Sequence, residues 1–302
     1  MLFEIVMIES IHATANSVYL SITNCLEFIM SKIIVSDISS PAIVGCSYIY
    51  APKGQALEYS ELASNPYSGC GHKCAYCYVP KALRMKSRES FDSIAIERSN
   101  YRAGLMRDAI KYDKAKTDAQ VMLSFTTDPY HPFDTSATRY ALEVISSTHG
   151  LGFCTLTKGG TRALRDINLF RANKDAFATT LTSLDDKFSK KWESGAALPN
   201  DRINAIQKFY EKGIFTWVSL EPTLDVDASI AIIQKTHSFV NLFKIGRVNY
   251  MPMTKTTDWE DYTKRIIDVC DKLGVNHYIK KDLQCFLPND YINPLRVKQH
   301  HD

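Results

Sequence analysis

A regular alternation of short apolar segments with longer, helix-like segments is the feature that most constrains the fold of this chain. The apolar segments are rich in β-branched and aromatic residues, and they occupy residues 121–125, 153–157, 177–182, 214–220, 240–245 and 275–279. They are almost continuously apolar rather than alternating, which is typical of parallel strands covered on both faces. A further strand is expected just before Asn65.

Segments of helical periodicity lie between these strands. Residues 201–212 place Ile203, Ile206 and Phe209 on one face, and Gly213 follows as a helix stop signal. Helices are predicted in the same way at residues 135–148, 161–172, 226–237 and 258–273. Repeated strand–helix units indicate a parallel sheet with right-handed crossovers. Because at most seven strands fall short of the eight in a closed barrel, we predict an α/β fold, a partial (β/α)6-type TIM barrel, with a doubly wound open sheet as the alternative.

The chain is expected to divide into four unequal parts. Residues 1–29 are rich in apolar side chains but contain Glu4 and Glu9 and no Lys or Arg, whereas a secretory signal starts with positive charge. We expect this segment to be an extension or a misassigned start ahead of Met30, with a helix packed on the domain as the alternative. The rest is predicted to form a lead-in segment, a core domain and a tail, at residues 30–59, 60–285 and 286–302.

Composition excludes little beyond the membrane-spanning classes. The chain is 45% hydrophobic and 23% charged, as is usual for soluble globular proteins. No stretch approaches 18 consecutive apolar residues, so we predict no transmembrane helix and a cytoplasmic location. A net charge of +3 gives little reason by itself to infer binding to nucleic acid.

Three of the eight cysteines, Cys70, Cys74 and Cys77, fall within eight residues. A disulfide scaffold is not expected in a chain of this size without a secretory signal. Three thiolates leave a zinc site one ligand short, so His72 or a distant cysteine would have to complete it. A 4Fe–4S cluster held by three thiolates instead leaves one iron open to a small chelating ligand.

The cysteine loop reads NPYSGCGHKCAYCY over residues 65–78. Its CxxxCxxC spacing, with Tyr76 just before the last cysteine, resembles the signature of the radical S-adenosylmethionine (SAM) superfamily. Further segments resemble one branch of it, the spore photoproduct lyase and DNA-repair-photolyase-like proteins. These segments are FTTDPYHP (125–132), LTKGG (156–160), TTLTSLDDKFSKKWESG (179–195) and VSLEPTLD (218–225).

The resemblance implies a core domain of the radical SAM type. In that family the three cysteines hold a 4Fe–4S cluster, the open iron binds SAM, and one-electron reduction cleaves SAM to a 5′-deoxyadenosyl radical. It also implies an external one-electron reductant of the flavodoxin or ferredoxin type. The substrate is left open, with nucleic acid or a nucleotide as the candidate that the resemblance supplies.

Polar residues follow successive predicted strands, where the sites of parallel α/β folds form. The cofactor-binding candidates are Tyr76, Thr127, Asp128, Lys158, Thr180, Ser219 and Glu221. The resemblance implies that Thr127 and Lys158 hold the methionine end of SAM, a carboxylate suited to a cation. It implies that Tyr76 and either Ser219 or Leu220 lie near the adenine, and it places Thr180 near the ribose.

Three of these candidates have a simpler interpretation. Thr180 is also a common strand residue, Lys158 could be a solvated loop lysine, and Glu221 could be a cap. Lys280 and Lys281 could attract an anionic substrate, but two adjacent lysines after a strand usually lie on the surface. The sequence leaves these alternatives open.

Phe125 departs from the pattern of the branch. Spore photoproduct lyase has a hydrogen-donating cysteine at this position, and phenylalanine has no transferable S–H. The two tyrosines of the relay, Tyr76 and Tyr78, are present, and Tyr78 is the catalytic candidate. Cys154 is expected to be a core residue on another strand. We therefore predict radical generation but not thymine-dimer repair.

Two other classes of function compete with a radical enzyme. A non-enzymatic zinc or iron–sulfur module would need the missing fourth ligand. An electron-transfer protein would normally hold its cluster with four cysteines and would have no SAM pocket.

Overall fold

The structure, a computed structural model, describes residues 47–249, 251–288 and 291. The described residues belong to one compact unit that begins at Ser47. The predictions for residues 1–29, for residues 30–46 of the lead-in segment and for most of the tail lie outside the described residues, so the lead-in segment from here on means residues 47–59. None of the described helices is long and apolar enough to cross a membrane.

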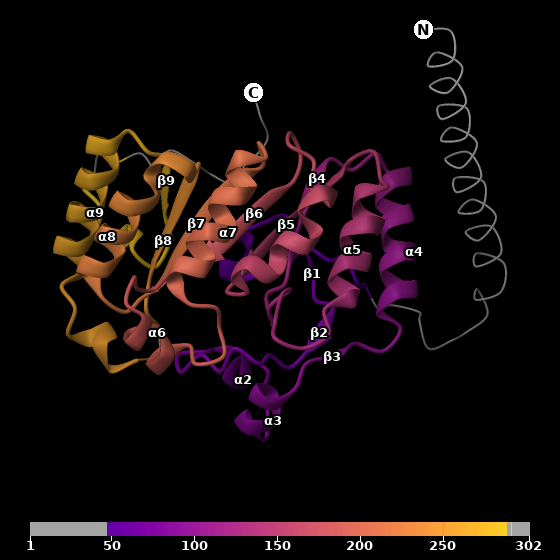
Figure 1. Ribbon diagram of the computed structural model, residues 1–302, viewed down its shortest axis with the longest axis horizontal. Helices are drawn as coiled ribbons and strands as arrows, with labels where there is room; N and C mark the ends of the chain where they lie inside the picture. Colours follow the sequence, from indigo (N-terminus) through magenta and orange to yellow (C-terminus); the bar gives the residue numbers. More distant parts are fainter. Residues whose placement is uncertain (1–46, 250, 289–290, 292–302) are drawn as a thin grey trace, which may run out of the picture. The chain divides into compact units, whose positions relative to one another are not determined.

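A seven-stranded sheet in which all neighbours are parallel forms the centre of the fold (Figure 1). Its order is β1-β4-β5-β6-β7-β8-β9, so each new strand joins the same edge. The strands are β1 (Leu62–Ser64), β4 (Ala119–Leu123), β5 (Leu151–Thr157), β6 (Ala176–Thr180), β7 (Phe215–Thr223), β8 (Leu242–Arg247) and β9 (His277–Ile279). Two short strands, β2 (Tyr67–Ser68) and β3 (Ile96–Glu97), form a separate antiparallel pair. Within the described residues β1 and β9 do not pair, and the predicted partial barrel is confirmed.

Helices cover one face of the sheet and follow the order of the strands (Figure 1). They are α4 (Tyr101–Lys114), α5 (Ser136–Ser146), the 3-10 helix η3 (Gly160–Leu169), α7 (Pro199–Glu211), α8 (Val226–Thr236) and α9 (Trp259–Leu273). Gly213 follows α7 with φ of +77°, a conformation that glycine adopts without strain, so the predicted stop signal is confirmed. The short helices are α2 (Val79–Ala82), α3 (Arg88–Ser93), α6 (Asp186–Trp192) and the 3-10 turns η2 (Gly54–Glu58), η4 (His237–Phe239), η5 (Pro252–Lys255) and η6 (Gln284–Phe286).

Both faces of the sheet are buried, which explains why the strands read as continuous apolar segments. Val121 packs in the large core that includes helix residues such as Ile206, whereas its neighbour Met122 packs in a second core on the opposite, inner face. Neighbouring side chains point to opposite faces of a strand. The inner-face core contains Met122, Cys154, Ala176, Ala178, Trp217, Leu242 and Tyr278.

The lead-in segment crosses the inner face and links the two edges of the sheet. The Tyr50 nitrogen donates to the carbonyl oxygen of Ala63, in the middle of β1, at 3.0 Å. At the other edge, the hydroxyl of Tyr278 in β9 donates to the carboxylate of Glu58 at 3.1 Å. Lys244 in β8 donates to the carbonyl oxygen of Glu58 at 3.2 Å. The open side of the partial barrel is thus bridged by residues that precede β1.

Helix α4 was not among the predicted helices. Its buried face includes Gly104 and Asp108, which interrupt the apolar repeat that reveals a helix. Both residues are needed because the lead-in segment lies against them: a Cβ on Gly104 would come within 2.0 Å of the Tyr48 ring, and Asp108 accepts from the nitrogen of Ile49 at 3.0 Å. Helix α6 was also missed. All seven predicted strands are present, β1 just before Asn65 among them, and so are the five predicted helices, one of them as the 3-10 helix η3, with ends shifted by a few residues.

The ammonium of Lys244 is buried on the inner face, 4.5 Å from the centre of the Trp217 ring. Burial lowers the pKa of Lys244 to about 8. An unfolded lysine titrates near 10.4, so the folded protein binds fewer protons than the unfolded chain between these values, and stability rises with pH there.

We therefore expect Lys244→Met to change the pH dependence of stability. Relative to the variant, the wild-type protein should gain about 1–3 kcal/mol of unfolding free energy as the pH rises from 7 to 10. Urea unfolding at several pH values measures this difference. Identical pH profiles of stability for the two proteins would show that burial does not lower the pKa of Lys244.

Candidate functional site

The cysteine loop follows β1 and β2 at the carboxyl end of the sheet. Cys70, Cys74 and Cys77 are all partly exposed. Backbone hydrogen bonds hold the loop on both sides: Cys70 donates to Phe91 at 2.7 Å, and Ala75 donates to Trp192 at 2.8 Å. The loop is therefore clamped between α3 and the end of α6.

Gly195 allows the chain after α6 to approach the cysteine loop closely. A Cβ at this position would lie 2.0 Å from the carbonyl oxygen of Gly71. The Gly195 nitrogen donates to the carbonyl oxygen of His72 at 3.0 Å. The final glycine of the WESG segment is thus a packing requirement of the loop.

Asp128 joins the ends of two strands to the cysteine loop. Its buried carboxylate accepts from the Thr157 hydroxyl at 2.5 Å, from the Lys158 nitrogen at 2.8 Å and from the Tyr130 nitrogen at 2.8 Å. Nδ1 of His72 lies 3.2 Å from the same carboxylate. Burial by itself would raise the pKa of Asp128, but His72 and the hydrogen-bond donors outweigh burial and hold this pKa below its usual value.

His72 is occupied on both ring nitrogens and is only 1% exposed. Nδ1 donates to Asp128, and Nε2 accepts from the guanidinium of Arg162 at 2.9 Å. Arg162 in turn donates to the carbonyl oxygen of Tyr130 at 3.0 Å. His72 therefore positions the loop and is not free to be the fourth ligand of a zinc site.

The end of β4 is tied to the loop by three further hydrogen bonds. The Thr127 hydroxyl donates to the carbonyl oxygen of Gly69 at 2.6 Å, just before the first cysteine. The side-chain oxygen of Asn65 accepts from the Phe125 nitrogen at 2.8 Å. The Tyr78 hydroxyl donates to the carbonyl oxygen of Phe125 at 2.7 Å. The catalytic candidate Tyr78 thus contacts the backbone of residue 125, the position at which the resemblance implies a cysteine.

Glu193 and Arg202 are buried site residues that the sequence analysis missed. The Tyr76 hydroxyl donates to Glu193, whose other oxygen lies 2.6 Å from Arg202. Arg202 also donates to the carbonyl oxygen of Thr180 at 3.0 Å. Burial would raise the pKa of Glu193, but the cations of Arg202 and Lys158 outweigh it and lower that pKa. Glu193 lies within the 179–195 segment that carries the family resemblance. An acidic residue next to Trp192 in that segment was the feature of the sequence that could have identified it.

Lys158 is a cation whose ammonium has no hydrogen-bonded partner among the described residues. It lies 5.6 Å from the centre of the Tyr76 ring, and no ion pair joins it to another described residue. Burial would lower the pKa of Lys158, but Cys74 and Glu193 outweigh burial and raise that pKa. The site therefore keeps a positive charge beside the second cysteine.

The thiolate forms of the three cysteines need positive charge nearby, because burial disfavours a negative charge. Burial raises the pKa of all three, and for Cys74 it does so to about 12 although Lys158 opposes the shift. Coordinated metal deprotonates a thiol outright. Within the described residues no three His, Cys, Asp or Glu side chains converge closely enough to hold one metal ion.

Glu221 and Lys280 form an ion pair that faces the inner face of the sheet. Both Lys280 and the Tyr59 hydroxyl donate to one oxygen of Glu221. Lys280 is only 2% exposed, so the interpretation of this lysine as a surface residue is wrong, whereas Lys281 is exposed. Ser219 is buried and precedes Glu221 by two residues, so both side chains point to the same face of β7.

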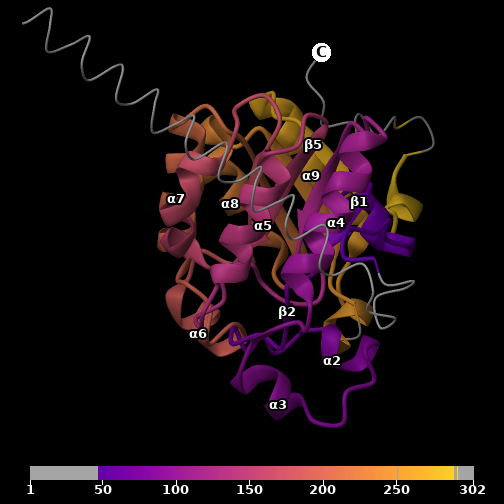
Figure 2. The ribbon, with the colours of Figure 1, turned by 90° about the vertical axis from the view of Figure 1, so that its right-hand side faces the viewer.

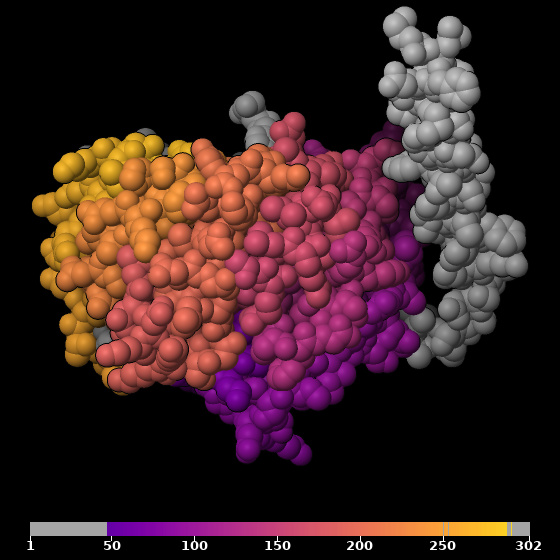
Figure 3. All heavy atoms as spheres, viewed as in Figure 1, coloured from indigo at the N-terminus to yellow at the C-terminus, as the bar shows by residue number. Residues whose placement is uncertain are grey.

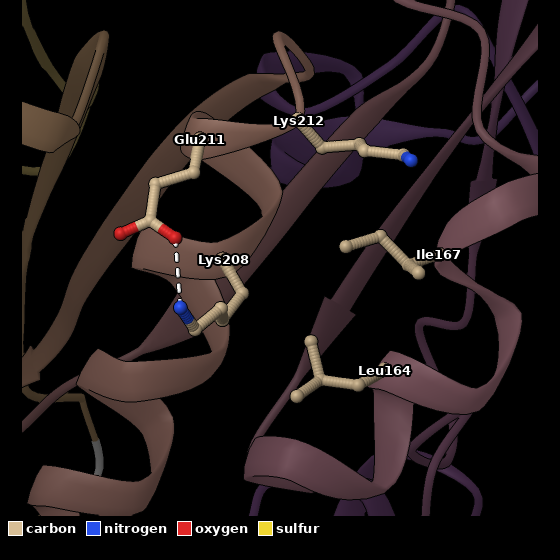
Figure 4. Close-up of a pocket in the computed structure, with 5 residues that line it drawn as sticks. All are labelled: Leu164, Ile167, Lys208, Glu211 and Lys212. Atoms are coloured by element: carbon tan, nitrogen blue, oxygen red, sulfur yellow. Dashed lines mark hydrogen bonds and ion pairs between the residues drawn. The ribbon is translucent and has the colours of Figure 1, made fainter.

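A hollow on the outer helical layer lies apart from this site. It is lined by Leu164, Ile167, Lys208, Glu211 and Lys212, with 2.9 Å between the ammonium of Lys208 and the carboxylate of Glu211 (Figure 4). These residues come from η3 and the carboxyl end of α7, and none of the predicted site residues lines the hollow. It takes no part in the argument for function.

The family model of the radical SAM superfamily matches residues 64–225, which is more than half of the chain. The chain belongs to the radical SAM superfamily. The matched region contains the cysteine loop and every predicted site residue. Radical SAM enzymes use SAM, an iron–sulfur cluster and a reductant, and this chain is a radical SAM enzyme.

Curated relatives of this enzyme carry no described activity. An uncharacterised protein of Methanocaldococcus jannaschii is 24% identical over 75% of this chain and 86% of its own length. An uncharacterised protein of Mycobacterium tuberculosis is 27% identical over 57% of this chain and 52% of its own length.

Solved structures share the fold of this radical SAM enzyme. Spore photoproduct lyase with a bound dinucleoside spore photoproduct matches with a TM-score of 0.59 and 14% identity, over 78% of this chain and 79% of that one. SuiB of Streptococcus suis bound to SAM matches with a TM-score of 0.56 and 13% identity, over 76% of this chain and 53% of that one. At these identities the likeness establishes the fold alone.

Asp128→Asn should weaken the cysteine loop of this enzyme. Both oxygens of the carboxylate accept hydrogen bonds from N–H groups. An amide has only one acceptor oxygen, so its NH2 group would face an N–H donor and at least one buried hydrogen bond would be lost. We expect the iron bound per chain after anaerobic reconstitution to fall by at least about half. Asp134→Asn is the matched control because Asp134 is exposed and bonds only within its own turn. Full iron content in the Asp128 variant would contradict this role.

Proposed function

We propose that this enzyme holds a 4Fe–4S cluster with Cys70, Cys74 and Cys77 and cleaves SAM to methionine and a 5′-deoxyadenosyl radical. The observation that carries the proposal is the position of Lys158, a cation without a bonded partner in the described structure, beside Cys74 and the Tyr76 ring. When bound, the cluster supplies the electron for the cleavage. The residues of this chain bind and orient the cofactor.

The donor set fits a cluster better than zinc. Three thiolates lie on one clamped loop, and His72 is engaged elsewhere. Cys154 and Cys270 are fully buried in the two cores, and for Cys154 this confirms the expected core position. A single zinc ion needs its ligands to converge on one point, whereas thiolates that bind different irons of a cluster do not.

The cofactor would lie across the carboxyl ends of the strands. Lys158 would pair with the carboxylate of the methionine moiety. Thr127, whose hydroxyl bonds the start of the cysteine loop at Gly69, is the second residue proposed for this end of the cofactor. Tyr76 stays fixed next to the adenine because Glu193 holds its hydroxyl. Thr180 and Ser219 remain proposed neighbours of the ribose and adenine, while Asp128 and Glu221 act through the hydrogen bonds and ion pair described above.

The proposed substrate class is nucleic acid or a nucleotide. It rests on the likeness to spore photoproduct lyase with its dinucleoside ligand. Phe125 cannot donate a hydrogen atom, so thymine-dimer repair is not proposed. Tyr78, whose phenol lies at the Phe125 carbonyl, is the proposed hydrogen donor or relay residue. The electron comes from an external donor of the flavodoxin or ferredoxin type, and a cytoplasmic location is part of the proposal.

Anaerobic reconstitution with iron and sulfide, followed by dithionite and SAM, tests the proposal. We expect 5′-deoxyadenosine to form in the wild-type enzyme and not in Cys74→Ala, which loses one of the three ligands. Cys285→Ala is the control because Cys285 is exposed and outside the loop. Tight zinc binding without SAM cleavage would overturn the proposal.

Lys158→Met should weaken SAM binding while it retains the volume of the side chain. Hydrogen bonds to charged groups contribute about 1.5–3 kcal/mol, so we expect the Kd for SAM to rise by roughly 10–150-fold. Equilibrium dialysis of the reconstituted enzyme measures this. Lys190→Met, on the exposed side of α6, is the control. An unchanged Kd would remove Lys158 from the cofactor site.

A further inference from the structure

Exposed apolar side chains gather around the cysteine loop. Among the described residues, six of the eight large apolar side chains on the surface are Tyr78, Leu83, Met85, Ile94, Ile96 and Phe133. Two of them flank the loop directly: a Cβ on Gly71 would touch the Phe133 ring, and a Cβ on Gly69 would touch the backbone of Ile94. Single exposed apolar residues are ordinary, but a group of them marks an interaction surface.

The same region has an excess of positive charge. Residues 62–88 contain no Asp or Glu, and their five basic residues, Lys73, Lys81, Arg84, Lys86 and Arg88, are all exposed. Glu89 and Asp92 follow in α3, and Asp92 pairs with Arg88 at 3.1 Å, so the lysines and Arg84 carry the local excess. The whole chain has a net charge of only +3, so the positive charge is local. We call the residues Lys81, Leu83, Arg84, Met85, Lys86 and Arg88 the basic–apolar surface.

This surface is continuous with the cysteine loop. Helix α2 begins two residues after Cys77. Arg88 donates to the carbonyl oxygen of Ala75 at 3.3 Å and also to that of Cys74. Helices α2 and α3 lie beyond the same end of the sheet in both ribbon views (Figure 1, Figure 2). Their atoms project from the lower edge of the space-filling view (Figure 3).

We propose that the basic–apolar surface docks the protein that reduces this enzyme, an acidic one-electron donor of the flavodoxin or ferredoxin type. The inference rests on the proposed function, because only a redox cluster needs such a partner. One electron passes from the reduced donor to the oxidised cluster, and no bond is formed or broken. Opposite charges steer the two proteins together, and the small apolar centre favours a brief complex.

The chemistry of this surface favours a protein partner over nucleic acid. Single-stranded nucleic acid binds where aromatic side chains offer stacking platforms. Leu83 and Met85, the apolar members of the basic–apolar surface, are not aromatic, and Leu83 is 55% exposed. The exposed aromatic rings of Tyr78 and Phe133 lie in and beside the cysteine loop, outside this surface. Lys158, the cation proposed to meet the cofactor, lies instead at the strand ends, and Lys280 on the inner face is paired with Glu221.

Charge reversal tests the proposal with the reconstituted full-length enzyme. In Arg84→Glu/Lys86→Glu, we expect 5′-deoxyadenosine formation driven by a reduced acidic flavodoxin to fall at least about tenfold at low ionic strength. Formation driven by dithionite should not change, because this small reductant needs no docking. The control Lys264→Glu/Lys272→Glu makes the same charge change on exposed positions of α9 and should leave both rates unchanged.

A binding measurement separates docking from turnover. The Kd of the flavodoxin for the reconstituted wild-type enzyme should rise with salt, and it should rise in the Arg84/Lys86 variant but not in the α9 control. Leu83→Ser/Met85→Ser should weaken binding without changing its salt dependence. Iron content, measured for every variant, shows that the loop is intact.

The outcomes distinguish this proposal from the function on which it rests. No 5′-deoxyadenosine with dithionite in the wild type would overturn the proposed function. A dithionite-active enzyme whose flavodoxin-driven rate survives charge reversal, or that no flavodoxin or ferredoxin reduces, would overturn the docking surface alone. The docking surface alone would also be overturned if charge reversal abolished binding of a single-stranded oligonucleotide but left the flavodoxin-driven rate unchanged.

Discussion

The buried carboxylate of Asp128 is the interaction on which the functional end of the molecule depends. It accepts from the end of β5, from its own turn and from His72 in the cysteine loop. A buried carboxylate without partners costs several kcal/mol, and a hydrogen bond to a charged group contributes about 1.5–3 kcal/mol. The loop, β4 and β5 must therefore be in place together, or this charge is left unpaired.

A second buried charge network holds the opposite side of the loop. Glu193 bonds the Tyr76 hydroxyl and Arg202, and Arg202 reaches the end of β6. The cysteine loop has almost no regular secondary structure of its own, so its geometry comes from these two networks. Lys158 lies between them, and its ammonium has no hydrogen-bonded partner among the described residues, which suits it to an anionic part of a cofactor.

The inner face of the sheet is polar at the strand ends and apolar beneath. Glu221 and Lys280 pair near the site, whereas Lys244 lies deeper among Trp217 and Tyr59. The lead-in segment supplies Tyr59 and so completes this interior. Radical chemistry benefits from such a setting, because closely packed side chains exclude water and competing reactions. In the two proposals, cofactor binding and electron delivery involve different parts of the molecule, the strand ends and the outside of the cysteine loop.

The parallel sheet, most helices and the three-cysteine loop could be predicted from the amino-acid sequence, because these depend on local periodicity and spacing. The burial of Lys280, the support of Tyr76 by Glu193 and Arg202, and the formation of helix α4 around a buried Gly104 became visible only in the folded chain. Each of these depends on a partner distant in sequence: Lys280 pairs with a carboxylate 59 residues away, and Glu193 meets a hydroxyl 117 residues away. A charged residue looks the same in a sequence whether it is solvated or paired, and its partner is known only after folding.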